Sequence, residues 1–201
     1  MRSYTYLALG DSYTIGEAVT IVDSFPYQAV QLLRDKGHAF CAPELIAKTG
    51  WTTDELFTAI KSYRLLTRYD FVSLLIGVNN QYRGRDIIEY KEQLQELIEK
   101  ALVVANNKKE HVFLISIPDY SVTPFGQERN PEKIRSEIDM FNGVGKALSV
   151  QYKIQFIEIT AGSREAKENP ELLASDSLHP SAKEYEKWAK KLADAISIQL
   201  K

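Results

Sequence analysis

The sequence predicts a three-layer α/β sandwich, in which helices cover both faces of a mainly parallel sheet. Short β-type runs alternate with longer amphipathic stretches along the chain, and this alternation implies right-handed crossovers between parallel strands. The runs at residues 71–76 and 112–115 are almost continuously apolar, which is typical of strands covered on both faces. No internal repeat, low-complexity tract or linker is visible, so we expect residues 1–201 to form a single domain.

The elements of this sandwich are expected in strict strand–helix order. The five strands are expected at residues 4–9, 44–48, 70–76, 111–117 and 154–159. The five helices that follow them are expected at residues 24–36, 52–66, 86–106, 131–150 and 181–199, each with apolar residues on one face. Two helix starts, Thr52 with Glu55 and Ser181 with Glu184, have the spacing of a capping box, which satisfies orphan amides.

Composition and charge exclude several classes of protein. The chain has 25 Lys and Arg against 27 Asp and Glu, a net charge of -2, so it lacks the basic footprint of a nucleic-acid binder. Its one cysteine, Cys41, forms no intrachain disulfide or thiolate metal cluster. Charges interrupt every apolar stretch before bilayer-spanning length, so we expect no stable membrane insertion. Only Arg2 precedes a short alternating segment, unlike a signal peptide, which favours a cytoplasmic location.

The loops after the strands are where chemistry is expected. In open parallel sheets, ligands bind outside the carboxyl ends of the strands. The segments expected at that edge are residues 10–23, 49–53, 77–85, 118–130 and 161–179.

A candidate nucleophile follows the first strand directly, in Gly10-Asp11-Ser12-Tyr13. Gly10 permits a tight bend that exposes the Ser12 hydroxyl beside free amides of the next turn. A serine in this position attacks only if a base removes its proton. The alternative is that Ser12 simply caps a strand-to-helix turn.

A candidate base lies before the last helix. Asp176 precedes His179 by three residues in an expected loop. This spacing can bring the carboxylate to Nδ1 of the imidazole, which fixes its tautomer and leaves Nε2 free. His38 and His111 have no comparable partner in the sequence. The alternative for Asp176 and His179 is hydrogen bonding at the helix entry.

Two further segments offer hydrogen-bond donors. Asn79 follows the third strand in Gly77-Val78-Asn79-Asn80, and its side-chain N–H is suited to stabilising an oxyanion. Gly50, after the second strand, offers a backbone amide that a ligand can approach closely. Both segments are also good turn formers. Together with the serine, histidine and aspartate, they supply what a serine hydrolase requires.

These four blocks resemble those of the SGNH hydrolases, the GDSL-type esterases and lipases. Gly10-Asp11-Ser12-Tyr13 matches the first block of that family, Gly50 the second, Gly77-x-Asn79 the third and Asp176-x-x-His179 the fifth. The order and spread of the blocks extend the resemblance over essentially the whole chain. The resemblance implies a flavodoxin-like five-stranded parallel sheet with strand order 2-1-3-4-5.

The resemblance also implies roles for individual residues. Ser12 would be acylated, His179 would act as base and then as acid, and Asp176 would orient the imidazole. The Ser12 amide, the Gly50 amide and the Asn79 side chain would form the oxyanion hole. No metal or cofactor is implied, and the expected partner is a small-molecule ester.

Two positions depart from the family pattern, and both bear on the substrate pocket. Tyr13 stands where the GDSL motif has leucine, and Asn80 stands where aspartate usually follows the oxyanion asparagine. Asp11 is expected to stabilise the nucleophile turn. Loop aromatics, Phe125 among them, are suited to stacking on a sugar or lining an acyl pocket. The candidate substrate-binding residues are Tyr13, Asn80, Tyr82 and Tyr120.

Two other functions fit parts of the sequence. The segment 12–16 resembles the phosphate loop of flavodoxins, which favours an electron carrier that binds FMN. A non-catalytic carbohydrate-binding domain on the same fold is a further alternative. A flavin carrier has no need of Asp176 and His179, and a binding domain has no need of a triad. The favoured hypothesis is therefore a serine esterase, acting on a short-chain, acetylated-carbohydrate or lysophospholipid ester, with its oligomeric state left open.

Overall fold

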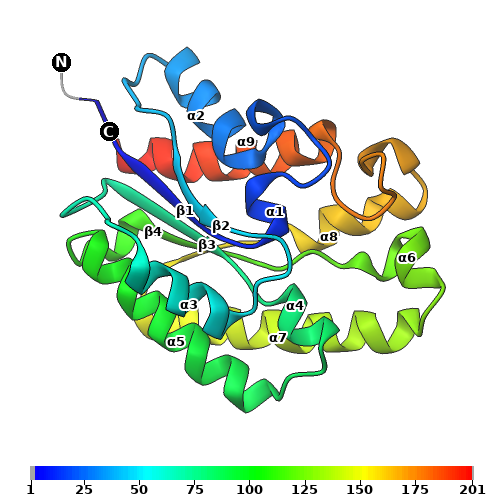
Figure 1. Cartoon of the computed structure of the whole chain (residues 1–201). Helices are drawn as coiled ribbons and strands as arrows, with labels where there is room; N and C mark the ends of the chain where they lie inside the picture. The colour runs from blue at the N-terminus through cyan, green and yellow to red at the C-terminus, as the bar shows by residue number, and fades with distance from the viewer. Residues whose placement is uncertain (1–2, 201) are drawn as a thin grey trace.

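A computed structural model describes residues 3–200 and has at its centre a five-stranded parallel sheet (Figure 1). The strand order is β2-β1-β3-β4-β5, which confirms the predicted architecture and order. The strands are β1 (Tyr6–Gly10), β2 (Glu44–Ala47), β3 (Phe71–Leu75), β4 (Val112–Ile115) and β5 (Gln155–Ile157).

The middle of the sheet forms the centre of the core. Every residue of β1, β3 and β4 is buried, as expected of strands covered on both faces. β1 pairs with β2 on one side and β3 on the other, so that Leu9 lies in register with Ile46 and Leu74. The carboxyl ends of β1, β2 and β3 therefore lie side by side, and the loops that leave them share one edge of the sheet.

Five long helices cover the sheet, two on one face and three on the other (Figure 1). Helices α2 (Phe25–Asp35) and α9 (Ala182–Gln199) pack together on the first face. Helices α3 (Thr53–Ser62), α5 (Ile87–Val104) and α7 (Pro131–Tyr152) cover the second. All five helices predicted from apolar periodicity are present, with ends that differ by at most four residues from those expected.

One of the two predicted capping boxes is confirmed and the other is wrong. At the start of α3, Glu55 Oε2 accepts a hydrogen bond from the Thr52 amide at 2.9 Å, and the capping box is complete. At the start of α9, the Ser181 hydroxyl instead donates to the Glu171 carbonyl. Glu184 is buried, and its Oε1 accepts from Trp188 Nε1 at 2.8 Å. The Trp188 indole, one turn further along α9, thus holds the glutamate that the capping box needs.

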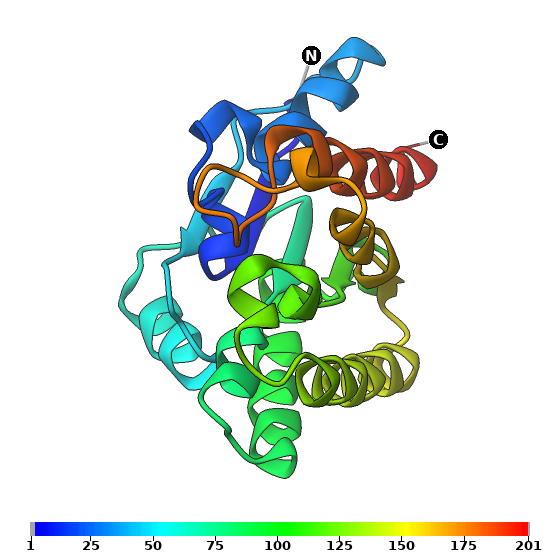
Figure 2. The same cartoon turned by 90° about the vertical axis from the view of Figure 1, so that its right-hand side faces the viewer.

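The predicted loops contain short helical segments that the sequence did not indicate. The α-helical ones are α1 (Ser12–Ile15), α4 (Val78–Tyr82), α6 (Pro124–Gln127) and α8 (Thr160–Ser163). The 3₁₀ segments are η1 (Ile21–Asp23), η2 (Lys109–His111), η3 (Tyr120–Val122), η4 (Arg164–Lys167) and η5 (Pro170–Leu172). Figure 2 looks onto the edge where α1 (blue), α6 (green) and the segment before α9 (orange) gather.

The opposite edge of the sheet carries the beginning of β1 and the end of α9 (Figure 1). Within residues 3–200, no helix has the length and apolar character needed to cross a bilayer.

Candidate active site

The first block forms a sharp turn that places Ser12 at the start of α1. Gly10 ends β1, and a Cβ there would lie 2.1 Å from Thr14 Oγ1 and 2.4 Å from the Leu75 carbonyl oxygen. Only glycine fits this bend. Asp11 then caps α1, its Oδ1 accepting from the Tyr13 amide at 3.0 Å. As expected, Asp11 stabilises the turn, and Ser12 follows it at the floor of a pocket.

Asp11 lies completely out of contact with solvent, directly behind the nucleophile turn. Burial raises the pKa of its carboxyl to about 7, although hydrogen bonds from the Tyr13 amide and the Asn79 side chain act in the opposite direction. A carboxyl group in this state exchanges its proton near neutral pH. The turn therefore contains a buried group that titrates in the physiological range.

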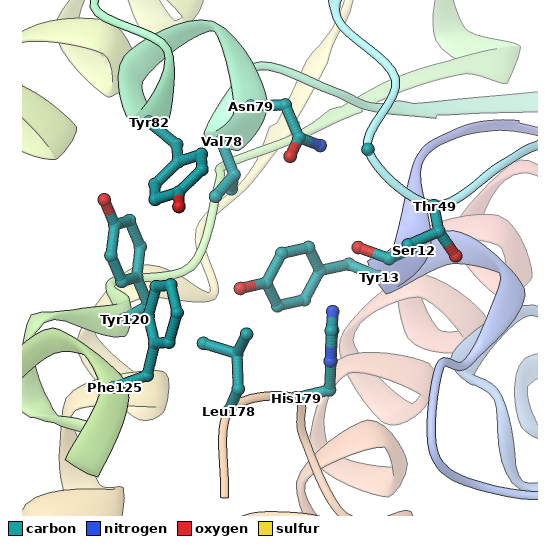
Figure 3. Close-up of a pocket in the computed structure, with 11 residues that line it drawn as sticks. Ser12, Tyr13, Thr49, Val78, Asn79, Tyr82, Tyr120, Phe125, Leu178 and His179 are labelled. Atoms are coloured by element: carbon teal, nitrogen blue, oxygen red, sulfur yellow. The ribbon is translucent and has the colours of Figure 1, made fainter. Parts of the chain in front are cut away.

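The fifth block brings a carboxylate to the imidazole, as its spacing predicts. Asp176 Oδ2 lies 2.6 Å from His179 Nδ1, and Oδ1 accepts from the backbone amides of Leu178 and His179, both at 3.0 Å. Burial opposes ionisation of Asp176, but the hydrogen bonds from His179 and Leu178 outweigh it and lower its pKa. The other ring nitrogen of His179, Nε2, faces Ser12 across the pocket (Figure 3).

Backbone amides of the first and second blocks meet at the same rim. Gly50 has a φ of +84°, in a turn closed by a hydrogen bond from the Trp51 amide to the Lys48 carbonyl. Within residues 3–200, neither the Ser12 amide nor the Gly50 amide donates to a protein acceptor. Both are therefore free to donate to a ligand in the pocket that Ser12 and Gly50 line.

Helix α4 fixes the turn that carries Gly50. Asn79 Nδ2 donates to the Trp51 carbonyl at 3.0 Å and, more weakly, to Asp11 Oδ2 at 3.3 Å. One helical turn further on, Arg83 Nη2 donates to the Gly50 carbonyl at 2.5 Å. The second and third blocks are thus joined by direct hydrogen bonds to the Gly50 and Trp51 carbonyls.

Asn80 is the one candidate substrate-binding residue that the structure does not bring into the pocket. Its buried side chain accepts from the Thr53 amide at 3.1 Å and donates to Thr53 Oγ1 at 2.7 Å. Thr53 Oγ1 in turn donates to Gln93 Oε1 at 2.5 Å. Both the oxygen and the nitrogen of the Asn80 side-chain amide have hydrogen-bond partners. Asn80, which departs from the family pattern, therefore stabilises the start of α3 and does not contact the substrate pocket.

The other candidate substrate-binding residues line one pocket of about 180 Å³ together with Ser12, Gly50, Asn79 and His179. Its lining residues are Ser12, Tyr13, Thr49, Gly50, Val78, Asn79, Tyr82, Tyr120, Phe125, Leu178 and His179 (Figure 3). Asp176 is not among the lining residues and is linked to the pocket through His179. Sequence reasoning assigned no role to Thr49, Val78 or Leu178. Each lies directly beside a motif residue, Thr49 before Gly50, Val78 before Asn79 and Leu178 before His179. That adjacency was the only signal in the sequence.

An aromatic wall, defined here as Tyr82, Tyr120 and Phe125, forms the side of the pocket away from Ser12 and His179 (Figure 3). Its ring centroids lie 6.4 Å apart for Tyr82 and Tyr120, 5.9 Å for Tyr82 and Phe125, and 6.1 Å for Tyr120 and Phe125. The Arg129 guanidinium lies 3.4 Å from the Phe125 ring centroid. The wall is therefore held by ring packing, and it presents mainly apolar surface.

Sheet order, helix layers and the clustering of the four blocks at one edge define the class of this protein, an α/β hydrolase with the SGNH fold. The sequence matches the GDSL-like lipase/acylhydrolase family over residues 8–187. The chain belongs to this family and is a carboxylic ester hydrolase. The flavin-carrier alternative fits less well, because the Thr14 side chain of the supposed phosphate loop is buried.

Solved structures with the same fold are distant in sequence. The lipase/acylhydrolase from Enterococcus faecalis is 21% identical, with a TM-score of 0.78 and coverage of 98% of this chain and 96% of that one. Axe2, an acetylxylan esterase from Geobacillus stearothermophilus, is 20% identical, with a TM-score of 0.72 and coverage of 98% and 96%. TesA is 17% identical, with a TM-score of 0.72 and coverage of 96% and 97%. A comparison with curated proteins found no match.

Proposed function

We propose that this protein is a serine esterase that hydrolyses a carboxylic ester through an acyl-enzyme intermediate on Ser12. The observation that carries the proposal is the placement of Asp176 on His179 Nδ1 at 2.6 Å, with Nε2 facing Ser12 in one pocket. This geometry supplies a nucleophile, a base with a fixed tautomer and an orienting carboxylate. Family membership supports the same chemistry.

In the proposed first half-reaction, Ser12 Oγ transfers its proton to His179 Nε2 and attacks the ester carbonyl carbon. The carbonyl oxygen becomes an oxyanion, which the Ser12 amide, the Gly50 amide and Asn79 Nδ2 stabilise. Collapse of this intermediate breaks the bond to the alcohol, and the protonated His179 donates its proton to the departing oxygen. In the second half-reaction, His179 takes a proton from water, and the hydroxide attacks the acyl carbonyl carbon. Collapse then breaks the bond to Ser12 Oγ, His179 returns the proton to that oxygen, and the acid is released.

Asn79 has to change one contact to play this part. Its two Nδ2 hydrogens are directed at the Trp51 carbonyl and at Asp11 Oδ2, and the contact with Asp11 is the longer one. We propose that the hydrogen facing Asp11 is the one that turns to the oxyanion.

The proposed substrate is a small or short-chain ester, either a short acyl ester, an acetylated carbohydrate or a lysophospholipid-type ester. The modest, mainly apolar pocket supports a small bound group, and Tyr13, Tyr82 and Tyr120 would contact it. A structural neighbour described as an acetylxylan esterase is consistent with an acetylated carbohydrate. The cytoplasmic location and the absence of nucleic-acid partners expected from the sequence stay predictions.

Substitution of Ser12 by alanine tests the nucleophile. We expect hydrolysis of p-nitrophenyl acetate and butyrate to fall by about 10⁶-fold, as for removal of a triad serine, and labelling by a fluorophosphonate probe to disappear. Ser62→Ala is the matched control, since Ser62 is exposed at the end of α3. Labelling of Ser12→Ala at the wild-type rate would refute the assignment.

A further inference from the structure

Tyr13 carries a hydroxyl group into the active-site pocket without a protein partner. Its ring crosses the pocket, and its oxygen points toward the aromatic wall and Leu178 (Figure 3). The residue is only 4% exposed. Within residues 3–200, its phenol oxygen makes no hydrogen bond; the backbone amide alone is engaged, with Asp11.

An unpartnered hydroxyl in this position is open to whatever occupies the pocket that Tyr13 lines. Leucine, the residue of the GDSL motif, would offer that occupant no hydrogen-bond donor. The hydroxyl groups of the other two tyrosines of the pocket have a hydrogen-bond partner or access to water. Tyr120 donates to Gln81 Oε1 at 2.9 Å, and Tyr82 is half exposed to water. Among the three phenols of the pocket, the Tyr13 hydroxyl is therefore the one left for a ligand to engage.

The ring cannot easily turn away to find a partner elsewhere. It packs against the His179 imidazole at 5.1 Å between ring centroids and against Trp188 at 6.4 Å. Burial, with a contribution from the nearby Asp11 carboxyl, raises the pKa of the Tyr13 phenol. The phenol keeps its proton at working pH, so it is available as a hydrogen-bond donor.

We infer that Tyr13 is a specificity-determining residue whose hydroxyl donates a hydrogen bond to an oxygen atom of the substrate group held in the pocket. The inference rests on the proposed function. It narrows the substrate class to esters whose pocket-bound part has apolar faces for the aromatic wall and carries an oxygen atom besides those of the ester. Two sources share this chemistry: an acyl chain with an ether, keto or hydroxyl oxygen, and a sugar-like alcohol.

A second, smaller cavity beside the Tyr13 ring offers an alternative partner for the hydroxyl, a bound water molecule. It measures about 20 Å³ and is also lined by Tyr13, with Asp119, Thr123 and Glu184 among its polar neighbours. This is room for one water molecule. A water held there would satisfy the phenol without any contribution from the substrate, and substrate choice would then be independent of the hydroxyl.

The test uses pairs of esters that differ only by exchange of one CH₂ for an oxygen atom. The acyl arm compares p-nitrophenyl 3-methoxypropanoate with p-nitrophenyl pentanoate. The alcohol arm compares tetrahydropyran-4-yl acetate with cyclohexyl acetate. In each arm, kcat/KM for the oxygen-containing ester is divided by kcat/KM for its partner, in wild type and in Tyr13→Phe. Dividing the wild-type ratio by the variant ratio cancels the intrinsic reactivity of the esters.

We expect this double ratio to be about 10 or more in one of the two arms, as for a neutral hydrogen bond made only with one substrate. The arm in which it occurs identifies the acyl group or the alcohol as the occupant of the pocket. Tyr63→Phe, which removes the hydroxyl of an exposed tyrosine outside the pocket, should leave the ratio at the wild-type value. A double ratio near 1 in both arms overturns the inference.

Failure of this inference and failure of the proposed function give different results. If Ser12→Ala hydrolyses these esters as fast as wild type, the proposed function is wrong. If hydrolysis depends on Ser12 while the double ratio stays near 1, the proposed function stands and only the hydrogen bond from Tyr13 to the substrate is refuted. Retention of the wild-type melting temperature and of fluorophosphonate labelling by Tyr13→Phe shows that a changed ratio does not come from a misfolded site.

Discussion

The two sides of the pocket are built in different ways. On the side of Ser12 and His179, hydrogen bonds fix the groups to which we assign catalytic roles, such as Asp176 on His179 and Asn79 on the Trp51 carbonyl. On the side of the aromatic wall, rings with centroids 5.9 to 6.4 Å apart pack on one another. Directional bonds hold groups in the exact pose that a transition state needs, whereas ring packing defines a shape. Changes on the first side should therefore alter turnover, and changes on the second should alter binding.

Among variants that keep Ser12, the largest effect is expected from Asp176→Asn, which removes the carboxylate on the hydrogen-bonded side of the pocket. The amide retains the size of the side chain but favours the wrong tautomer of His179, so we expect kcat to fall by about 10⁴-fold. KM should change little. Steady-state kinetics on a p-nitrophenyl ester measures both. Asp194→Asn, at a surface aspartate paired with Lys36, is the control. A loss of less than tenfold would remove Asp176 from the orienting role.

The second prediction concerns the buried carboxyl of Asp11. Its pKa is raised from 3.8 to about 7, so between these values the folded state holds a proton that the unfolded state has lost. Raising the pH through this window therefore favours unfolding, by on the order of 4 kcal/mol when complete. Urea denaturation at pH 5 and pH 8 measures the part of this loss that falls between those two values, on the order of 3 kcal/mol.

Asp11→Asn serves as the comparison for that measurement. The amide does not titrate, so the variant should lose less stability than wild type between the two pH values. Asp176 does not confuse the result: its pKa is lowered, and the stabilisation it provides is lost only as the pH falls below the ordinary range of aspartate. Parallel profiles for wild type and Asp11→Asn would contradict the raised pKa.

Asn79→Ala should have the third-largest effect. Removal of one side-chain donor to the oxyanion is expected to lower kcat by about 10²–10³-fold, with substrate binding little changed. Asn80→Ala, at the neighbouring residue outside the pocket, is the control that distinguishes an effect on catalysis from an effect on stability. It should lower the melting temperature, while the folded fraction hydrolyses the ester near the wild-type rate. Near wild-type turnover in Asn79→Ala would exclude that side chain from the oxyanion hole.

The smallest effect tests the aromatic wall. Phe125→Leu keeps an apolar side chain but removes the aromatic face that the wall would offer to a substrate, a contact worth about 0.5–1.5 kcal/mol. We therefore expect KM to rise by roughly 3- to 10-fold with kcat nearly unchanged. Phe57→Leu is the matched control, because Phe57 also lies under a cationic group, that of Lys61, but outside the pocket. A fall in kcat larger than the rise in KM would break the proposed division between the two sides.

Much of this architecture could be predicted from the sequence, because its signals are periodic or local. Apolar runs indicated the strands, and the spacing from Asp176 to His179 predicted their hydrogen bond. The strand order came from family resemblance, since periodicity carries no information on neighbours. The short helices were missed because four or five residues are too few to show a period.

Other features depend on contacts between segments distant in the sequence. Asn80 bonds to Thr53, 27 residues away, and nothing near either residue indicates it. The capping box predicted for Ser181 and Glu184 failed because the Trp188 indole holds the glutamate instead. That Tyr13 reaches the pocket could be anticipated, but that its hydroxyl lacks a partner there depends on every side chain around it.

The placement of the beginning of β1 and the end of α9 has a practical consequence. Both lie at the edge of the sheet opposite the pocket (Figure 1). A bead, an electrode or a fused protein attached near either of these points would lie on the side of the molecule opposite the pocket. Immobilised in this way, the enzyme would present its pocket outward to the surrounding solution, and neither attachment would require a change to the loops that carry the chemistry.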